Sequence, residues 1–444
     1  MLNRLTREQR RRIFGLALPI IGAMGSQNVI NLVDTAMVGS LGDKALAAVG
    51  VSSFVSFVAV SFVMGMSSGV QAMCARWRGA GRDDEVAVPL NGGLLMAVAI
   101  TLPLSAAVIT VVPSLLSMLS PEPEVVALGS AYLRLRVLGM TAVGMNFAFR
   151  GYWNAVDMSR LYMVTLLGMH ASNIFLNWVL IYGHLGAPAL GLSGAGLANA
   201  ISTYLGSALY FALAWKHGRG AGFLQRLPSR EAMRTMLAMS LPAGLQQFLF
   251  AAGMMALFGI LSRVGTAEVA AANVLFNIML VTILPSIGFG LAAATLVGQA
   301  LGARERREAS RWAWRVSLVA VVVVVLISLP GLVAPDLILK PFLRDAGTRA
   351  LAVWPLRIAA VFAPFESLAA VLMSAHLGAG SARRVLLISV ISQWGLFLPL
   401  AWLVGPVLGL GLVAIWLLQG VCRMLTVVVF AWSWRQGRWA EVAV

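Results

Sequence analysis

Charged residues are scarce in this chain: they make up 11% of its 444 residues, whereas an ordinary soluble domain carries about 25%. Hydrophobic residues account for 59%, and the mean hydropathy is +0.86. These values predict a polytopic membrane protein. There are two cysteines, Cys74 and Cys422, and both lie in or at the end of apolar segments, so the chain has no disulfide framework.

Histidine and acidic residues are also few, with four histidines and 17 acids against 33 basic residues. A membrane-embedded enzyme needs a catalytic cluster at depth, such as paired aspartates or a His/Glu metal motif, and the sequence shows neither. We therefore expect a protein that is not an enzyme, with no catalytic residue and no cofactor. The net charge of +16 suggests nucleic acid as a partner, but the distribution of the basic residues argues against it.

Apolar segments of transmembrane length recur along the chain and predict twelve helices. They lie at about 13–38, 45–75, 86–112, 125–150, 160–183, 192–215, 236–262, 268–300, 310–333, 348–377, 384–406 and 408–434. Of the 33 basic residues, 24 fall at every second connection and near the two ends of the chain. The positive-inside rule then predicts a multi-pass protein of the cell inner membrane with both termini cytoplasmic, so the basic excess needs no nucleic acid.

The second half of the chain repeats the first. A shift of 223 residues without gaps lays Leu18-Pro19 on Leu241-Pro242, and Gly65 on Gly288. Each repeat holds six expected helices, so both copies insert with the same orientation. We predict an all-α fold of two pseudo-symmetric six-helix bundles around a central cleft, which is a transporter architecture. The lobes are expected at 1–217 and 236–444, joined by a basic cytoplasmic linker at 218–235.

One carboxylate interrupts the first apolar segment. Gln27, Asn31 and Asp34 are spaced four and three residues apart, so a helix carries them as one polar stripe. A charged side chain at bilayer depth costs about 2.5–3.5 kcal/mol and is therefore normally turned inward and functional. The alternative is an aspartate near a helix end that caps the helix or reaches the surface. The repeat places Leu257 opposite Asp34, which confines this charge to the first lobe.

Carboxamides occur on two later expected helices. Asn173 and Asn177 are four residues apart and share a helix face, and Asn199 lies on the next helix. Three glycines that precede Asn199 are expected to let a neighbouring helix approach closely: Gly191, Gly194 and Gly196. Carboxamides that converge on a carboxylate donate to it, or help to bind a small hard cation through oxygen. A single membrane asparagine alternatively acts as hydrogen-bonding glue between helices.

Two further residues are notable for their position. Glu366 is the other acid expected at membrane depth, and it belongs to the second lobe. It is either functional or an interior acid kept protonated or hydrogen-bonded. Pro19 lies about four turns before Asp34, where its missing backbone hydrogen bond makes it a hinge candidate. Alternatively, Pro19 only marks the first turns of the helix.

The chain resembles the multidrug and toxic compound extrusion (MATE) transporters along its whole length. The resemblance rests on LALPI (16–20), NLVDTAMVGSLGDKALAAVG (31–50), RGYWNA (150–155) and GLSGAGLANA (191–200). The sequence looks most like prokaryotic members, of the DinF-like or NorM-like branch. The resemblance implies an antiporter, driven by inward H⁺ or Na⁺, that exports small amphipathic, often cationic, drugs and toxic compounds by alternating access.

The resemblance also implies roles for individual residues. The cation-coupling site of the family maps onto four residues, which would also hold a coupling Na⁺: Asp34, Asn173, Asn177 and Asn199. Asn177 stands where some members carry an acid, and with one negative charge fewer we favour H⁺ over Na⁺. Gln27, Asn31 and Asn154 are expected to line the substrate cleft. Phe250 stands where NorM-like members place a glutamate, so a second-lobe site would rest on Glu366.

A flippase and a membrane-embedded enzyme are the alternative functions for this sequence. A flippase for lipid-linked precursors belongs to the same superfamily, but such proteins tend to carry extra helices and a basic cavity. This chain has four candidate arginines at depth: Arg134, Arg136, Arg357 and Arg423. A membrane-embedded enzyme is the rival from another class. We expect the protein to act as a monomer within the bilayer.

Overall fold

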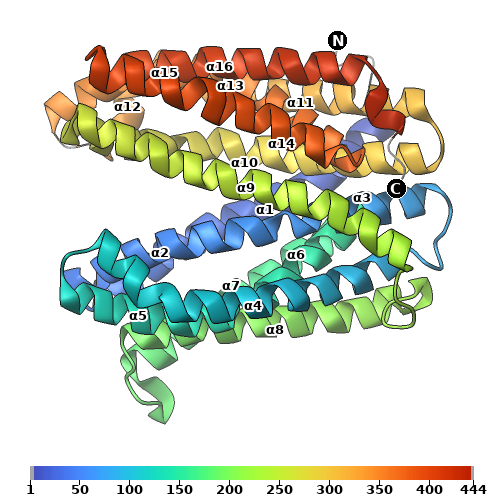
Figure 1. Ribbon diagram of the computed structural model, residues 1–444, viewed down its shortest axis with the longest axis horizontal. Coiled ribbons are helices and arrows are strands. Elements are labelled where there is room, and N and C mark those ends of the chain that lie inside the picture. Colours follow the sequence, from blue (N-terminus) through green and yellow to red (C-terminus); the bar gives the residue numbers. More distant parts are fainter. Residues whose placement is uncertain (1–4, 344, 442–444) are drawn as a thin grey trace. The chain divides into compact units, whose positions relative to one another are not determined.

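The computed structural model describes residues 5–343 and 345–441, and the regular elements in this part of the chain are all helices (Figure 1). They are α1 (Arg7–Gly39), α2 (Asp43–Met64), α3 (Met66–Gly79), α4 (Val88–Leu119), α5 (Pro123–Leu138), α6 (Met140–Ala155), α7 (Ser159–Tyr182), α8 (Leu192–Gly218), α9 (Arg230–Val264), α10 (Thr266–Gly302), α11 (Arg306–Val333), α12 (Pro335–Leu339), α13 (Ala346–Gly378), α14 (Ala382–Val390), α15 (Leu398–Trp402) and α16 (Gly411–Arg435). Short 3₁₀ and π-helical segments connect some of them, and π-helical turns (Ile391–Phe397 and Leu403–Val407) flank α15.

Eleven stretches of the described chain are long and apolar enough to cross a membrane, and the bent pair α5–α6 makes a twelfth. The prediction of an all-α protein with twelve spans is therefore confirmed. The α5–α6 pair bends by 46° at Gly139, where a Cβ would lie 3.0 Å from Cα of Ala200 on α8. A glycine is needed there because the two backbones nearly touch, and a glycine is also a common site for a helix kink.

The chain folds into two compact units. One unit runs from Gly22 to Gly244, and the other combines the residues up to Ile21 with those from Leu245 onward. Both divisions fall inside a long helix, α1 or α9, two residues after its proline, Pro19 or Pro242. The two dividing points lie 223 residues apart, which equals the shift of the sequence repeat. We expected lobes at 1–217 and 236–444, joined by a linker at 218–235. That division places the whole of α1 in the first lobe, and it stays a prediction.

Close packing holds each half-helix in its unit. In the unit that contains α10, a Cβ on Gly288 would lie 2.4 Å from Cγ1 of Ile21 on α1. In the unit that contains α2 and α3, a Cβ on Gly65 would lie 2.1 Å from the backbone nitrogen of Gly244 on α9. Gly65 corresponds to Gly288 in the repeat, and Gly244 corresponds to Ile21. The repeat in the sequence is thus reproduced as a repeat in helix packing.

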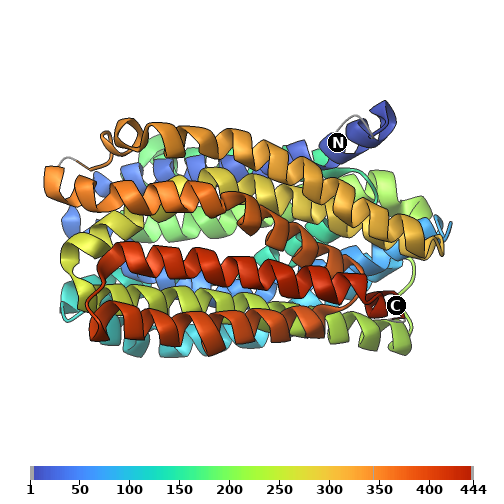
Figure 2. The ribbon, with the colours of Figure 1, turned by 90° about the horizontal axis from the view of Figure 1, so that it is seen from above.

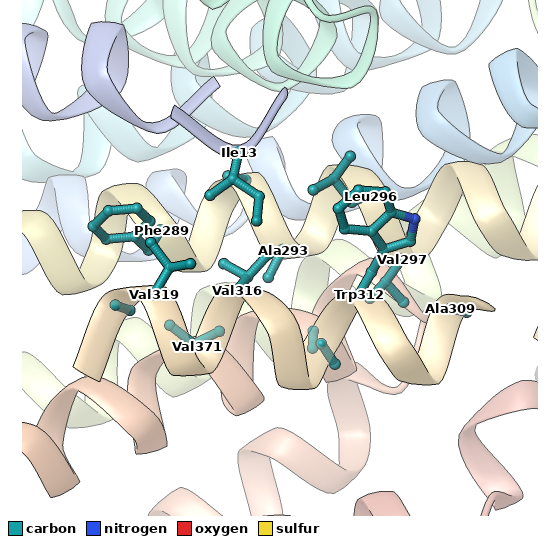
Figure 3. Packing of buried hydrophobic residues seen from close by; sticks show 14 of the residues in the cluster. Ile13, Phe289, Ala293, Leu296, Val297, Ala309, Trp312, Val316, Val319 and Val371 are labelled. Atoms are coloured by element: carbon teal, nitrogen blue, oxygen red, sulfur yellow. The ribbon is translucent and has the colours of Figure 1, made fainter. Parts of the chain in front are cut away.

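The unit with the C-terminal residues has its core around α10, α11 and α13, which lie side by side (Figure 1 and Figure 2). Figure 3 shows the start of α1 closing this core through Ile13, which is fully buried. The same cluster contains Phe289, Ala293, Leu296 and Val297 of α10, Trp312, Val316 and Val319 of α11, and Val371 of α13. Alanines between the large side chains let these helices approach closely, which favours dispersion contacts in a membrane setting.

The other unit packs α7 on α8, α8 on α5, and α3 and α4 on α6. The segment after α8 is tied to α4 by the buried side chain of Asn91. Its Nδ2 donates to the carbonyls of Gly222 (2.9 Å) and Arg226 (2.7 Å), and its Oδ1 accepts from the backbone N–H of Leu224 (3.0 Å). Part of the expected linker is therefore fixed on the protein by hydrogen bonds between its backbone and the Asn91 side chain.

Candidate functional site

Asp34 of α1 lies beside Asn177 of α7, within one compact unit. Nδ2 of Asn177 donates to Oδ1 of Asp34 across 2.7 Å. Asp34 is half-buried, whereas Asn177 is only 2% exposed. A carboxylate in this setting lacks the hydration it would have in water, so a fixed amide donor is a substantial part of its solvation.

A chain of polar groups continues from Asn177 into the unit. The same Nδ2 lies 3.2 Å from Oδ1 of Asn173, one turn earlier on α7. Nδ2 of Asn173 donates to Oγ of Ser202 on α8 (3.2 Å), and this hydroxyl donates to the backbone carbonyl of Asn199 (3.0 Å). Asp34, Asn177, Asn173 and Asn199 are thus brought together, Asn199 through its carbonyl. Ser202 was missed, because a serine on an apolar helix gives no distinctive signal.

Oδ1 of Asn177 is buried and has no hydrogen-bond partner among the residues that the structure describes. It lies on the amide whose nitrogen already binds Asp34. An amide oxygen next to a carboxylate is the kind of donor set that a small hard cation takes, and it can also accept a hydrogen bond from a protonated carboxyl group. These residues therefore fit either a proton or a sodium ion.

Two glycines near the start of α8 let this helix pack closely against α7 and α5, beside the polar groups described above. A Cβ on Gly194 would lie 2.4 Å from the carbonyl oxygen of Leu180 on α7, and a Cβ on Gly196 would lie 2.5 Å from that of Tyr132 on α5. The expected close approach is confirmed for both. It is wrong for Gly191, where a Cβ would meet nothing within 4 Å. Gly191 has a φ of 55° and instead lets the chain turn before α8.

The polar stripe of α1 extends away from Asp34 through exposed side chains. Nε2 of Gln27 donates to Oδ1 of Asn31 (3.2 Å), so the expected stripe is formed. Oε1 of Gln27 lies 3.1 Å from Nε2 of His170 on α7, which is within hydrogen-bond distance. His170 therefore links α7 to the stripe by a hydrogen bond between side chains.

Asn154 and Pro19 lie elsewhere. The side chain of Asn154 is fully buried near the end of α6, so it is not on an exposed surface of its unit in this conformation. Its role in substrate contact stays a prediction. Pro19 lies inside α1, which remains helical through it.

Arg136 of α5 is a charged neighbour that the sequence did not connect with Asp34. Its guanidinium is near enough to act electrostatically on the carboxylate. The arginine is held by a hydrogen bond from its Nη1 to the hydroxyl of Tyr132, one turn earlier (2.6 Å). A positive charge near Asp34 favours the ionised carboxylate and opposes a second cation beside it.

Glu366 of α13 lies in the other unit and forms an ion pair with Arg423 of α16. Oε2 of Glu366 is 2.8 Å from Nε of Arg423. Neither sequence-based alternative included this partner: the acid is paired with an arginine 57 positions later in the chain. Because Arg423 already neutralises Glu366, a coupling cation there would have to compete with an internal one.

Comparison with known proteins supplies the family. The MatE family model matches the chain twice, over residues 19–179 and 242–403. These matches begin at the two prolines that the sequence repeat superimposes, Pro19 and Pro242. The family model and the ungapped shift therefore identify the same internal repeat.

The chain is similar to proteins named for multidrug resistance. It is 30% identical to multidrug resistance protein NorM of Burkholderia vietnamiensis over 95% of this chain and 92% of that protein. It is 24% identical to probable multidrug resistance protein NorM of Thermotoga maritima, over 98% of this chain and 94% of that one.

Solved structures share the fold. The outward-facing conformation of a multidrug resistance MATE family transporter of the MOP superfamily matches with a TM-score of 0.86 and 22% identity, over 98% of this chain and 97% of that one. A crystal structure of MATE in complex with MaL6 matches with a TM-score of 0.87 and 21% identity, over 97% of each chain. The chain thus belongs to the MatE family, the multidrug and toxic compound extrusion transporters that its motifs resemble.

Proposed function

We propose that this protein is a cation-coupled antiporter that exports amphipathic, often cationic, drugs and toxic compounds by alternating access. H⁺ is the favoured coupling ion and Na⁺ the alternative. The names of the NorM relatives support multidrug export as the class of function. One observation carries the coupling: the buried amide of Asn177 donates through Nδ2 to the Asp34 carboxylate, while its oxygen has no partner in the described chain.

The proposed cycle changes the charge at Asp34. The ionised carboxylate accepts a hydrogen bond from Asn177, which is the geometry described above. When Asp34 takes up a proton, its hydroxyl becomes a donor and Oδ1 of Asn177 becomes its acceptor. A sodium ion would instead lie between the carboxylate and that oxygen. Either event removes a negative charge from a poorly hydrated position.

Drug export then requires that the cation and the drug favour different conformations; direct contact between them is unnecessary. One charge moving inward at 100 mV yields about 2.3 kcal/mol, enough for roughly a fifty-fold drug gradient. We assign the hinge to Pro19, because α1 passes from one compact unit to the other two residues later. A proline is where a helix bends at least cost in backbone hydrogen bonds.

The basic connections support a location in the cell inner membrane with both termini in the cytoplasm. Small organic molecules are the expected substrates, and we propose that the protein acts as a monomer. The flippase alternative is not favoured. It needs a basic cavity, whereas Arg423, one of the four depth arginines, is already paired with Glu366.

The test uses purified protein in proteoliposomes, with a pH gradient and a Na⁺ gradient imposed separately. We expect Asp34→Asn to lose gradient-driven drug export at least about tenfold, because a neutral side chain has no charge to exchange. Asp336→Asn, at an exposed acid of α12, is the matched control and should transport normally. Wild-type-like export by Asp34→Asn would overturn the proposal, and the gradient that drives the wild type identifies the ion.

A further inference from the structure

One face of α8 stays exposed from the middle of the helix to its end. The exposed residues recur at helical spacing, and small residues fill most of the opposite, buried side. Along most of this length the exposed face is apolar: Ile201, Tyr204, Leu205, Ala208, Leu209 and Ala212. Lipid tails are as apolar as these side chains, so such a face on a membrane helix contacts acyl chains. α8 therefore presents a lipid-facing stripe.

The same face becomes aromatic and then cationic where α8 ends. Trp215 is 52% exposed, and the exposed Lys216 follows it. The guanidinium of Arg219 lies over the Trp215 ring, 4.5 Å from its centroid. Tryptophan prefers the membrane–water interface, and lysine and arginine extend their charges from there towards the lipid headgroups. The end of α8 therefore has the composition of a segment at headgroup level.

The segment after α8 folds back to this level and is held there. Phe223 is fully buried, and its ring centroid lies 5.9 Å from that of Phe211 on α8, one turn before Trp215. The backbone N–H of Phe223 donates to the carbonyl of Gly218 (3.0 Å). The side chain of Asn91 binds the backbone on both sides of Phe223, as described above. The segment is therefore a fixed loop.

This fixed loop exposes two leucines, one of them in a strained conformation. Leu224 is 55% exposed, and Leu227 is 67% exposed. Leu224 has a φ of 54°, in the left-handed region that leucine rarely adopts. The hydrogen bond from its backbone N–H to Oδ1 of Asn91 holds it there (3.0 Å). A strained and exposed apolar side chain is costly in water, and contact with a membrane interface offsets that cost.

The charge of this region points to an anionic partner. The sequence has no acidic residue between Asp157 and Glu231. Residues 215–230 carry four basic side chains: Lys216, Arg219, Arg226 and Arg230. Arg226 already interacts with Glu85 at 3.4 Å. Lys216 and Arg219, which continue the lipid-facing stripe, are thus the cations best placed for a phosphate at the membrane surface.

We propose that the end of α8 and the fixed loop after it form a docking surface for anionic phospholipids of the cytoplasmic leaflet. Lys216 and Arg219 bind the headgroup phosphate. Trp215, Leu224 and Leu227 contact the upper part of the acyl chains. The surface lies within one compact unit, and the positive-inside rule favours the cytoplasmic side for it. The inference concerns lipid binding and is independent of which drug or ion the protein transports.

The test measures lipid binding to the purified full-length protein in detergent micelles by native mass spectrometry. The probes are dioctanoyl phosphatidylglycerol, which is anionic, and dioctanoyl phosphatidylcholine, which is zwitterionic. The measured quantity is the ratio of the affinity for the anionic lipid to that for the zwitterionic one. The wild type should favour the anionic lipid at least about tenfold. Each basic residue near a membrane surface contributes about fivefold, so Lys216→Gln with Arg219→Gln should lower the ratio at least about tenfold.

Arg263→Gln is the matched control. Arg263 is also an exposed arginine over an exposed tryptophan, since its guanidinium lies 5.2 Å from the ring centroid of Trp402. It is the only basic residue between Arg234 and Arg304, so it belongs to no basic patch of the sequence. Its removal should leave the ratio unchanged.

Leu224→Asn separates the apolar contact from the stability of the fold. Asparagine adopts a positive φ more readily than leucine, so this variant should melt at an equal or higher temperature in detergent without lipid. It should nevertheless bind both lipids at least about threefold more weakly with the ratio unchanged, because the lost contact is to acyl chains. Unchanged binding of both lipids would show that Leu224 has no part in the surface.

Equal affinity of the wild type for the two lipids would overturn the docking surface, and so would a ratio that Lys216→Gln with Arg219→Gln leaves unchanged. Inorganic phosphate is the third probe. If it displaces the anionic lipid at equal concentration, the site binds a soluble anion and the proposal is wrong. Failure of the proposed drug export has a separate readout, since lipid binding is measured without a gradient or a drug.

Discussion

Asn177 donates its amide to Asp34 across 2.7 Å while its own amide oxygen stays buried and unpartnered. The two residues are 143 positions apart in the chain and come from α1 and α7. An amide in this position responds to both states of the carboxyl group, since it donates to the ionised form and accepts from the protonated form. That is a simple way for one side chain to sense the charge of another.

The Asp34–Asn177 hydrogen bond should be measurable as a coupling energy. We expect a double-mutant cycle with Asp34→Leu and Asn177→Leu to give about 1.5–3 kcal/mol, because one partner of the bond is charged. The free energy of unfolding in detergent is the measurement. Asn277→Leu, at an exposed amide of α10 that bonds only to Asn273 one turn away, serves as the control and should have a small effect. Strictly additive effects of the two Leu substitutions would contradict the bond.

Gly196 should be intolerant of even one added methyl group. A Cβ there would lie 2.5 Å from the carbonyl oxygen of Tyr132, a backbone atom that cannot rotate away. We expect Gly196→Ala to lower the free energy of unfolding by about 1–3 kcal/mol. It should also weaken export, because α8 would move relative to Asn173. Gly259→Ala on α9 is the control, since its Cβ would meet nothing within 4 Å. Equal melting temperatures for the two variants would argue against this packing.

Glu85, in the connection before α4, should make the attachment of the segment after α8 sensitive to pH. Its hydrogen bond and charge interaction with Arg82 (2.5 Å), and its interaction with Arg226 (3.4 Å), lower the pKa of Glu85. A carboxyl group with a lowered pKa stabilises the folded state above its unfolded pKa. That contribution is lost as the pH falls through the folded pKa. The effect is modest, since exposed ion pairs are screened by water and salt.

We therefore expect faster hydrogen exchange of the backbone amides around Arg226 in buffer below the unfolded pKa of Glu85 than at neutral pH, once the rates are corrected for intrinsic exchange. Glu85→Gln should exchange quickly at both pH values. Glu231→Gln, on the first turn of α9, should behave like the wild type. Retained pH dependence in Glu85→Gln would assign the effect to another group.

Much of the fold was predictable because its signals are local. Hydropathy depends on the sequence itself, so the twelve spans agree with the helices to within several residues at their ends. The repeat was predictable too, since Gly65 and Gly288 recur at one spacing for one reason, a close helix contact. We also expected Gly191 to allow a close helix contact, but it lies in a turn instead. Several glycines near each other in a sequence do not show which of them allows a helix contact and which allows a turn.

The polar stripe of α1, and a position at membrane depth for Asp34 and Glu366, were predicted from the sequence alone, through helical periodicity and hydropathy. Tertiary structure decided their neighbours: the Asn177 amide and the nearby charge of Arg136 for Asp34, and the Arg423 guanidinium for Glu366. The physical reason is that membrane helices are apolar on their lipid-facing and their packed sides alike. Periodicity therefore does not define how each helix is rotated about its axis. That rotation depends on how side-chain volumes fit at contacts such as Gly196 against Tyr132.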